Sequence, residues 1–183
     1  ALISGGRLAA AIEALPTLQH PHLKHGTWCV RYMEGGDPGT LVVPEQCYLF
    51  VDRYVVPGET DETCIAQIME AAEKLGLSGK VDVRLKPRKS PYMQSFALKE
   101  DHPLVKILQE EFHSVTGKDL PCAYDASVCD SNILAVILGI PVVTFGPSGG
   151  NMHGDNEYGY AWQVKNCGEV YRRTVARLLS GEV

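Results

Sequence analysis

The chain has 183 residues, of which 45% are hydrophobic and 21% are charged, and its formal net charge is −5. This composition is typical of a folded globular protein and excludes a disordered chain. The negative charge argues against a nucleic-acid or anionic-membrane surface as a partner. No apolar run approaches the length needed to cross a bilayer.

The first half of the chain alternates helical and strand-like patterns. The expected elements are a helix over 5–15, a strand over 28–33, strand-like residues at 42–44 and 48–51, a helix over 61–75 with Thr60 as its N-cap, and a strand over 81–85. This order, helix, strand, strand, helix, strand, predicts an α+β ferredoxin-like unit that lacks its first strand.

A basic, proline-containing stretch over 87–91 predicts the boundary with a second unit. Beyond it we expect helices over 104–115 and 130–138, a buried strand over 141–145, and a C-terminal helix with an apolar face between residues 167 and 178. Alternation of helices with an apolar strand is typical of part of an α/β sheet.

The six cysteines do not form a C-x-x-C pair, which argues against a zinc ribbon or a thioredoxin-like redox motif. Several of them fall within apolar patterns, where a free cysteine behaves as a small hydrophobe. We therefore expect six reduced thiols and a cytoplasmic protein.

The segment 144–158 is the most informative part of the sequence. The expected strand runs directly into a glycine-rich loop that contains His153, followed by Asp155 and Glu157. In open α/β sheets ligands gather beyond the carboxyl ends of strands, and glycines there allow the backbone to approach a ligand closely. An imidazole in this loop could ligate a metal if Asp155 or Glu157 held its second nitrogen.

A single histidine does not make a zinc site, because three or four ligands are needed. Most histidines in loops are neither ligands nor catalysts, and the other five do not supply a convincing set. His20, His22 and His25 form an H-x-H-x-x-H cluster that we interpret as a solvated loop. His102 precedes Pro103 at a helix start and fits a capping role, and His113 is expected to be exposed.

Several motifs together resemble one family. They are Gly139–Pro147 followed by His153–Tyr158, the helix start Asp125–Asn132, Val42–Pro44, and Val51–Glu59. They resemble motifs of the aminoacylase, acetylornithine deacetylase, succinyl-diaminopimelate desuccinylase and carboxypeptidase G2 family of zinc metallopeptidases and amidohydrolases. The resemblance covers essentially the whole chain.

The resemblance implies an α+β ferredoxin-like lid domain followed by the C-terminal part of an α/β zinc-peptidase catalytic domain. Residues 1–90 would form most of a dimerising lid, and residues 91–183 the end of the catalytic domain. In this family two metal ions share a water, and a glutamate acts as general base. The ions are usually Zn²⁺, with Co²⁺ or Mn²⁺ possible. That glutamate and the remaining metal ligands would precede the lid, outside this sequence.

Residue by residue, the resemblance assigns a metal ligand and a substrate-binding segment, and no catalytic residue. His153 would ligate one metal, and the backbone of Ser148, Gly149, Gly150 and Asn151 would bind the carboxylate of the substrate. The sequence departs from the family at two lid positions, where Leu41 and Tyr54 stand in place of the usual Asn and Arg. Arg53 could substitute in substrate binding, or it could be an ordinary surface arginine on a strand.

The expected function is part of a metal-dependent hydrolase that cleaves an amide bond of an N-acyl amino acid or small peptide. Such a chain would be inactive alone and would form a homodimer through the lid. The alternatives are a non-catalytic dimerisation module or degenerate family member, and an unrelated binding domain whose loop only mimics the motif.

Overall fold

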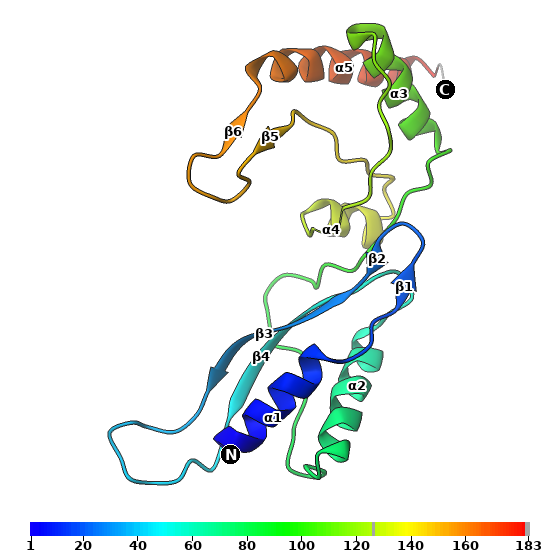
Figure 1. The fold of residues 1–183 in the computed structure, drawn as a ribbon. Coiled ribbons are helices and arrows are strands. Elements are labelled where there is room, and N and C mark those ends of the chain that lie inside the picture. Colours follow the sequence, from blue (N-terminus) through cyan, green and yellow to red (C-terminus); the bar gives the residue numbers. More distant parts are fainter. Residues whose placement is uncertain (126, 182–183) are drawn as a thin grey trace. The chain divides into compact units, whose positions relative to one another are not determined.

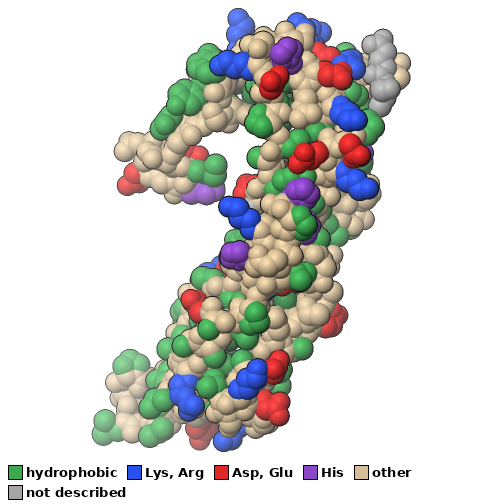
Figure 2. Space-filling view, turned by 45° about the vertical axis from the view of Figure 1, so that its right-hand side comes forward, with side chains coloured by type: hydrophobic (Ala, Val, Ile, Leu, Met, Phe, Trp, Pro, Cys, Tyr) green, Lys and Arg blue, Asp and Glu red, His purple; other side chains and the backbone are tan. Residues whose placement is uncertain are grey.

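The computed structural model describes residues 1–125 and 127–181, so Ala126 of the 125–132 motif lies outside the described residues. The chain divides into two compact units. The first contains Ala1–Ser95 with Asp125 and Ser127, and the second contains residues 96–124 and 128–181. The assignment of residues 1–90 to a lid and of 91–183 to a catalytic domain stays a prediction. Figure 2 shows basic and acidic side chains interspersed over the face in view.

The first unit is built from antiparallel strand pairs and two helices (Figure 1). Its elements are α1 (Leu2–Glu13), β1 (Gln19–His20), β2 (Lys24–His25), β3 (Thr27–Glu34), β4 (Tyr48–Tyr54) and α2 (Asp61–Lys74). Strand β1 pairs with β2, and β3 pairs with β4 along nearly its whole length, with an irregularity between Val30 and Tyr32.

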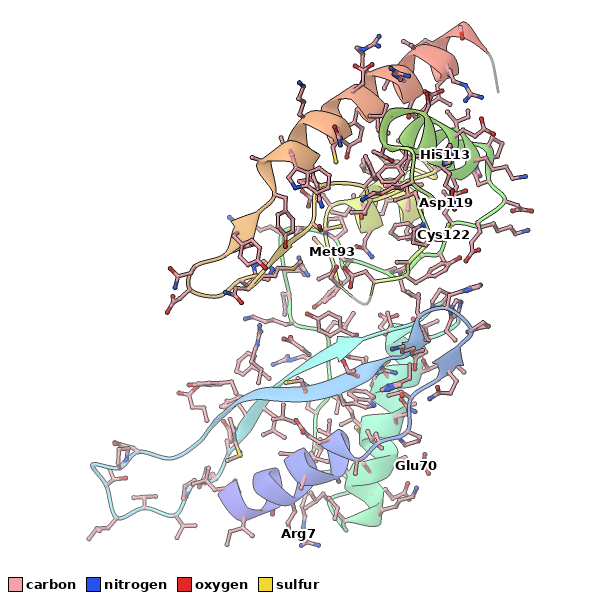
Figure 3. All side chains as sticks on the ribbon, turned by 45° about the horizontal axis from the view of Figure 1, so that its top comes forward. Arg7, Glu70, Met93, His113, Asp119 and Cys122 are labelled. Carbon is pink, nitrogen blue, oxygen red and sulfur yellow. The ribbon has the colours of Figure 1, made fainter. Side chains whose placement is uncertain are left out.

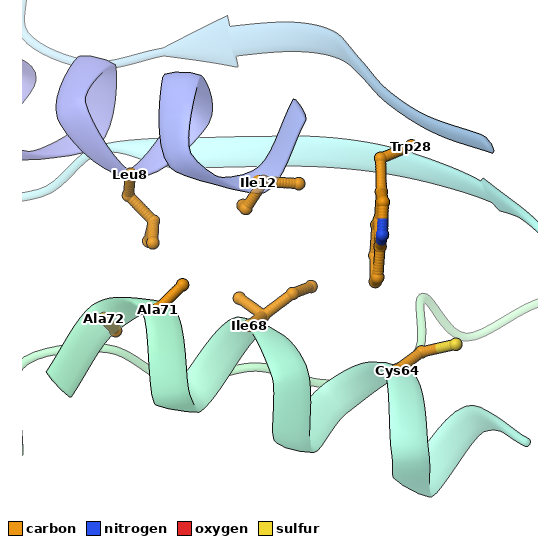
Figure 4. Close-up of a cluster of buried hydrophobic side chains, with 7 residues drawn as sticks. All are labelled: Leu8, Ile12, Trp28, Cys64, Ile68, Ala71 and Ala72. Carbon is orange, nitrogen blue, oxygen red and sulfur yellow. The ribbon is translucent and has the colours of Figure 1, made fainter. Parts of the chain in front are cut away.

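The core of this unit lies between α1, α2 and the β3–β4 pair. Polar residues such as Arg7 and Glu70 are on the outer sides of the two helices (Figure 3). The apolar stripes face inward (Figure 4). The buried cluster contains Leu8, Ile12, Trp28, Cys64, Ile68, Ala71 and Ala72. The 3.6-residue spacing of these positions on each helix explains why both helices form against the strands.

Helix α2 begins and ends where the sequence predicts. The Thr60 hydroxyl accepts a hydrogen bond from the Thr63 backbone N–H at 3.3 Å, and the Thr63 hydroxyl accepts one from the Thr60 N–H at 3.0 Å. This reciprocal arrangement satisfies two N–H groups at the helix start. Leu75 ends the helix, and Gly76 follows it with φ of +71°, a conformation that glycine adopts without strain.

Two strand predictions in this unit are wrong. Residues 42–44 are irregular, and Leu41, Val42 and Val43 are exposed. Residues 81–85 also join no ladder among the described residues, although Val81 and Val83 pack against the core cluster. A segment with alternating side chains forms a strand only if a neighbouring strand pairs with it through hydrogen bonds. Neither segment has such a neighbour in the described chain. The ferredoxin-like detail is therefore not confirmed, while the mixed α and β character is.

Helices make up most of the regular secondary structure of the second unit (Figure 1). Its elements are α3 (Pro103–Thr116), α4 (Ser131–Val136), β5 (Gly149–Gly150), β6 (Tyr158–Gly159) and α5 (Ala161–Ser180). The predicted cap at α3 is confirmed, because His102 Nδ1 accepts a hydrogen bond from the Leu104 N–H at 3.1 Å. Among the described residues, no helix combines the length and apolar character needed to cross a membrane.

Helices α3 and α5 pack on each other and hold the segment that leads to the glycine-rich loop. Val105, Ile107 and Leu108 of α3 are buried, as are Cys167 and Val170 of α5.

All six cysteines of the chain, including Cys167, are free thiols.

The prediction of a strand over 141–145 is wrong, because this segment is irregular in the described chain. It is held instead by Phe145, whose ring packs edge-on against Phe112 of α3 and Tyr171 of α5, with centroids 6.0 and 5.5 Å away. The Tyr171 hydroxyl also donates a hydrogen bond to the Phe145 carbonyl. The segment is therefore positioned by side-chain packing instead of by a strand neighbour.

Ion pairs within α5 predict a pH dependence. Glu169 accepts hydrogen bonds from Arg172 and Arg173, which lower its pKa from 4.5 to about 2, and Arg173 also bonds Ser114 of α3. A lowered pKa means that the contribution to stability is present above pH 4.5 and lost as the pH falls through about 2. Unfolding titrations between these pH values should show a smaller loss of stability for Glu169→Gln than for the native chain. If Glu169→Gln and the native chain lost the same stability over this pH range, the lowered pKa of Glu169 would be contradicted.

Candidate metal-binding hairpin

The glycine-rich loop forms a short β-hairpin. Gly149 lies opposite Gly159 and Gly150 lies opposite Tyr158, and the Tyr160 N–H donates to the Ser148 carbonyl at 3.2 Å. A Cβ atom at Gly149 would lie 1.9 Å from the Tyr158 carbonyl oxygen, a distance that no side chain tolerates. Glycine is therefore required at position 149 by the close approach of the two strands.

The connection between β5 and β6 carries His153 at its exposed tip. Asn151, His153 and Asn156 all have φ between 56° and 60°, a left-handed conformation that is uncommon outside glycine. Asn and His tolerate it better than most residues. The Gly154 N–H closes the turn on the Asn151 carbonyl at 2.8 Å. The sequence of this connection therefore matches a tightly turned backbone that presents the imidazole to solvent.

An acidic neighbour predicted to support His153 is present, but it contacts the backbone. The Glu157 carboxylate accepts a hydrogen bond from the His153 N–H at 3.3 Å. This contact ties the two ends of the turn together and fixes the Cα position of His153. Asp155 is exposed in the same turn.

The predicted substrate-binding segment lies beside this turn, and part of its hydrogen-bonding capacity is used internally. The Ser148 N–H and hydroxyl both donate to Gln163 Oε1 of α5, at 2.6 and 2.9 Å. Gly149 and Gly150 belong to the ladder with β6. The structure brings Ser148, Gly149, Gly150, Asn151 and His153 together in one hairpin, and the binding role of the first four stays a prediction.

The residues present do not complete a zinc site. Zinc needs three or four donors, and in the described part of the chain no group of three or more His, Cys, Asp or Glu side chains is arranged to hold a metal. His20, His22 and His25, set aside at the sequence level, do not form such a group either. An exposed imidazole on a well-defined turn could supply one ligand to a metal ion whose other ligands come from elsewhere.

Arg53, the remaining predicted substrate-binding residue, belongs to the first unit and is buried. Its side chain is 8% exposed, as is that of Glu59, with which it forms an ion pair. Its guanidinium also donates to the Tyr54 carbonyl and lies 4.7 Å from the centre of the Trp28 ring. The interpretation of Arg53 as an ordinary surface arginine is therefore wrong. A role in substrate binding stays a prediction.

Sequence reasoning missed the partners that hold these residues. In the sequence Glu59 is only the last residue of the Val51–Glu59 motif. In the structure it accepts hydrogen bonds from the Leu18 N–H at 3.2 Å and the Val56 N–H at 2.9 Å, and it pairs with Arg53. Gln163 accepts a hydrogen bond from Ser148, 15 residues earlier in the chain, and no local sequence pattern predicts that contact.

Comparison with known proteins leads to the same class of protein as the motifs. No family model matches the sequence. A succinyl-diaminopimelate desuccinylase from Nitrosomonas eutropha is 24% identical over 153 residues, which cover 84% of this chain and 38% of that protein. The crystal structure of an M20 family metallo-carboxypeptidase from Sulfolobus solfataricus matches with a TM-score of 0.53 and 18% identity, over 82% of this chain and 34% of that one.

The structural match, at this identity, shows that the fold is shared over most of the chain. The two comparisons together support the resemblance predicted from the motifs, to the M20 peptidases and amidohydrolases. The chain spans a little over a third of the length of each of these relatives, so it corresponds to part of such a protein.

Proposed function

We propose that this chain is part of a metal-dependent hydrolase that cleaves an amide bond of an N-acyl amino acid or small peptide. The relatives support hydrolysis as the class of reaction, since one is a desuccinylase and the other a metallo-carboxypeptidase. The observation that carries the proposal for this chain is the β5–β6 hairpin, which presents His153 on a tightly closed turn. A rigid backbone is what a ligand-bearing loop requires.

In this proposal His153 supplies one ligand to a site that is completed by residues outside the chain. The bound ions, Zn²⁺ or alternatively Co²⁺ or Mn²⁺, would polarise the amide carbonyl and activate water. The contribution of this chain is positional: Glu157 and the β5–β6 ladder hold the turn, and Ser148–Asn151 offer backbone groups to the carboxylate of the substrate. The chain alone would not catalyse the reaction.

The metal-ligand assignment predicts the effect of His153→Ala in a full-length protein that contains this chain. Removal of an outer-shell partner already costs about 10–100-fold in metal affinity or activity, so loss of a direct ligand should exceed about 100-fold in affinity for one ion. Zinc content per chain, measured by mass spectrometry after dialysis, should fall, and hydrolysis of N-acyl amino acids should fall with it.

His113→Ala is the matched control, because His113 is also an exposed histidine of the second unit. It lies at the end of α3, and its Nδ1 is 3.2 Å from an Asp119 carboxylate oxygen (Figure 3). This variant should keep its full zinc content. Equal zinc content in His153→Ala and the native protein would show that His153 is not a ligand.

The first unit is proposed to act as a dimerising lid in a cytoplasmic homodimer. The support is the fold shared with the relatives and the β3–β4 pair, which has no further strand neighbour among the described residues. The second candidate, a non-catalytic dimerisation module, predicts a dimer in solution without bound metal or hydrolysis. Sedimentation and metal analysis of the same full-length sample distinguish the two.

A further inference from the structure

Ser148, the residue just before β5, is attached to the start of α5 through three of its polar groups. Its backbone N–H donates to Gln163 Oε1 at 2.6 Å, and its hydroxyl donates to the same oxygen at 2.9 Å. Its carbonyl accepts a hydrogen bond from the Tyr160 N–H at 3.2 Å. Ser148 is exposed, so water could satisfy these groups if the contacts were absent. The contacts therefore fix the position of the residue and are not needed to satisfy buried groups.

The first turn of α5 uses its capping groups to make these contacts. Tyr160 is the N-cap of the helix, and Gln163 is its third residue. A glutamine at this position commonly accepts a hydrogen bond from the N-cap N–H of its own helix. Here the Tyr160 N–H donates to the Ser148 carbonyl instead, and the Gln163 side chain accepts from Ser148. Groups that usually cap the helix locally are thus directed to the glycine-rich loop.

Gln163 is itself held in place by the packed part of α5. Cys167, Val170 and Thr174 are buried, and they follow Gln163 at intervals of four, seven and eleven residues. This spacing places Gln163 on the same face of the helix as the buried residues. That face packs against α3. A hydrogen bond to Gln163 therefore connects the start of β5 to the core of the second unit.

We propose that Gln163 is a positioning residue that acts through Ser148 and fixes the segment Ser148–Asn151 against α5, so that this segment can bind the carboxylate of the substrate. The proposal rests on the proposed function and assigns a residue that supports its binding segment. Ser148 would contribute by holding the segment in place, since its N–H and hydroxyl are both engaged by Gln163.

Hydrogen exchange in the full-length protein tests the contact without any substrate. In Gln163→Leu the Ser148 N–H loses its acceptor, and its exchange should become about tenfold faster, as expected when hydrogen bonds of this kind are lost. Gln163→Glu keeps an acceptor oxygen at the same place and should keep the protection. Gln109→Leu is the matched control, because Gln109 of α3 also bonds a loop residue, the Leu120 carbonyl, at 2.9 Å. Exchange of the Ser148 N–H should be unchanged in this variant.

Kinetics with N-acetyl- and N-succinyl-L-alanine test the consequence for binding. In Gln163→Leu we expect KM to rise about tenfold with little change in kcat, because the carboxylate is bound equally in the ground and transition states. Zinc content should stay that of the native protein, since the turn is closed by its own contact between Glu157 and the His153 N–H. Ser148→Ala should raise KM less, because the N–H bond to Gln163 remains. Added to Gln163→Leu, it should raise KM no further.

The outcomes separate failure of the positioning role from failure of the proposed function. Additive effects of Ser148→Ala and Gln163→Leu on KM would show that Ser148 contacts the substrate directly, and would overturn the positioning role. An unchanged KM in Gln163→Leu, or unchanged exchange of the Ser148 N–H, would overturn it as well. If no N-acyl amino acid were hydrolysed but N-acetyl-L-alanine bound about tenfold more weakly to Gln163→Leu, the positioning role would stand and the proposed reaction would fail.

Discussion

Replacement of Glu59 by alanine is expected to destabilise the first unit by about 3–5 kcal/mol, the usual cost of removing one partner from a buried ion pair. Glu59 and Arg53 are each 8% exposed. Arg53 Nε already has no hydrogen-bond partner among the described residues. Without Glu59 the buried guanidinium would lose its counter-charge, and the Leu18 and Val56 N–H groups would lose their acceptors.

Urea unfolding followed by the fluorescence of Trp28 measures this effect, because the Trp28 ring lies beneath the Arg53 guanidinium. A Trp162→Phe background leaves Trp28 as the only tryptophan of the chain. Glu70→Ala is the control: Glu70 pairs with Lys74 on the outer surface of α2, where both side chains are more than half exposed (Figure 3). Its midpoint should stay near that of the native chain. Similar midpoints for Glu59→Ala and Glu70→Ala would show that the buried pair contributes little.

Substitution of Gly149 by alanine is expected to open the β5–β6 hairpin. The added Cβ would lie 1.9 Å from the Tyr158 carbonyl oxygen, and the atom it meets is backbone that cannot rotate away. Such overpacking costs about 1–3 kcal/mol, which is as much as the few hydrogen bonds of a two-residue ladder contribute. The Tyr160 amide, which donates to the Ser148 carbonyl, should lose its protection from hydrogen exchange. Zinc affinity of the full-length protein should fall with it.

Gly146→Ala tests the same loop without a steric conflict, since a Cβ at Gly146 would have no neighbour within 4 Å. Protection of the Tyr160 amide should survive in this variant. If Gly149→Ala retained the protection as well, the close approach of β5 and β6 would not describe the protein in solution.

The helices could be predicted from the sequence because their signals are local. Thr60 and His102 cap helices as predicted, and the apolar spacing within α1 and α2 identifies the faces that form the core. The strands predicted over 81–85 and 141–145 are different, because a strand also depends on a neighbour that alternation cannot supply. No such neighbour is found for either segment in the described chain.

The candidate site was only partly accessible to sequence reasoning. The order of glycines, His153 and acids predicted a loop that could hold a ligand, and the hairpin brings those residues together. The roles of Glu59 and Gln163 depend on contacts across 6 and 15 residues, whose partners are chosen by the tertiary fold. The burial of Arg53 was missed for the same reason.

The left-handed backbone at Asn151, His153 and Asn156 limits which mutations the hairpin can accept. Valine, isoleucine and threonine are disfavoured at all three positions because a branched Cβ clashes in that conformation. In a set of random substitutions, the left-handed backbone would therefore exclude residues before any requirement of metal binding did. A similar series of Gly, Asn and His in an unrelated protein would report the same turn.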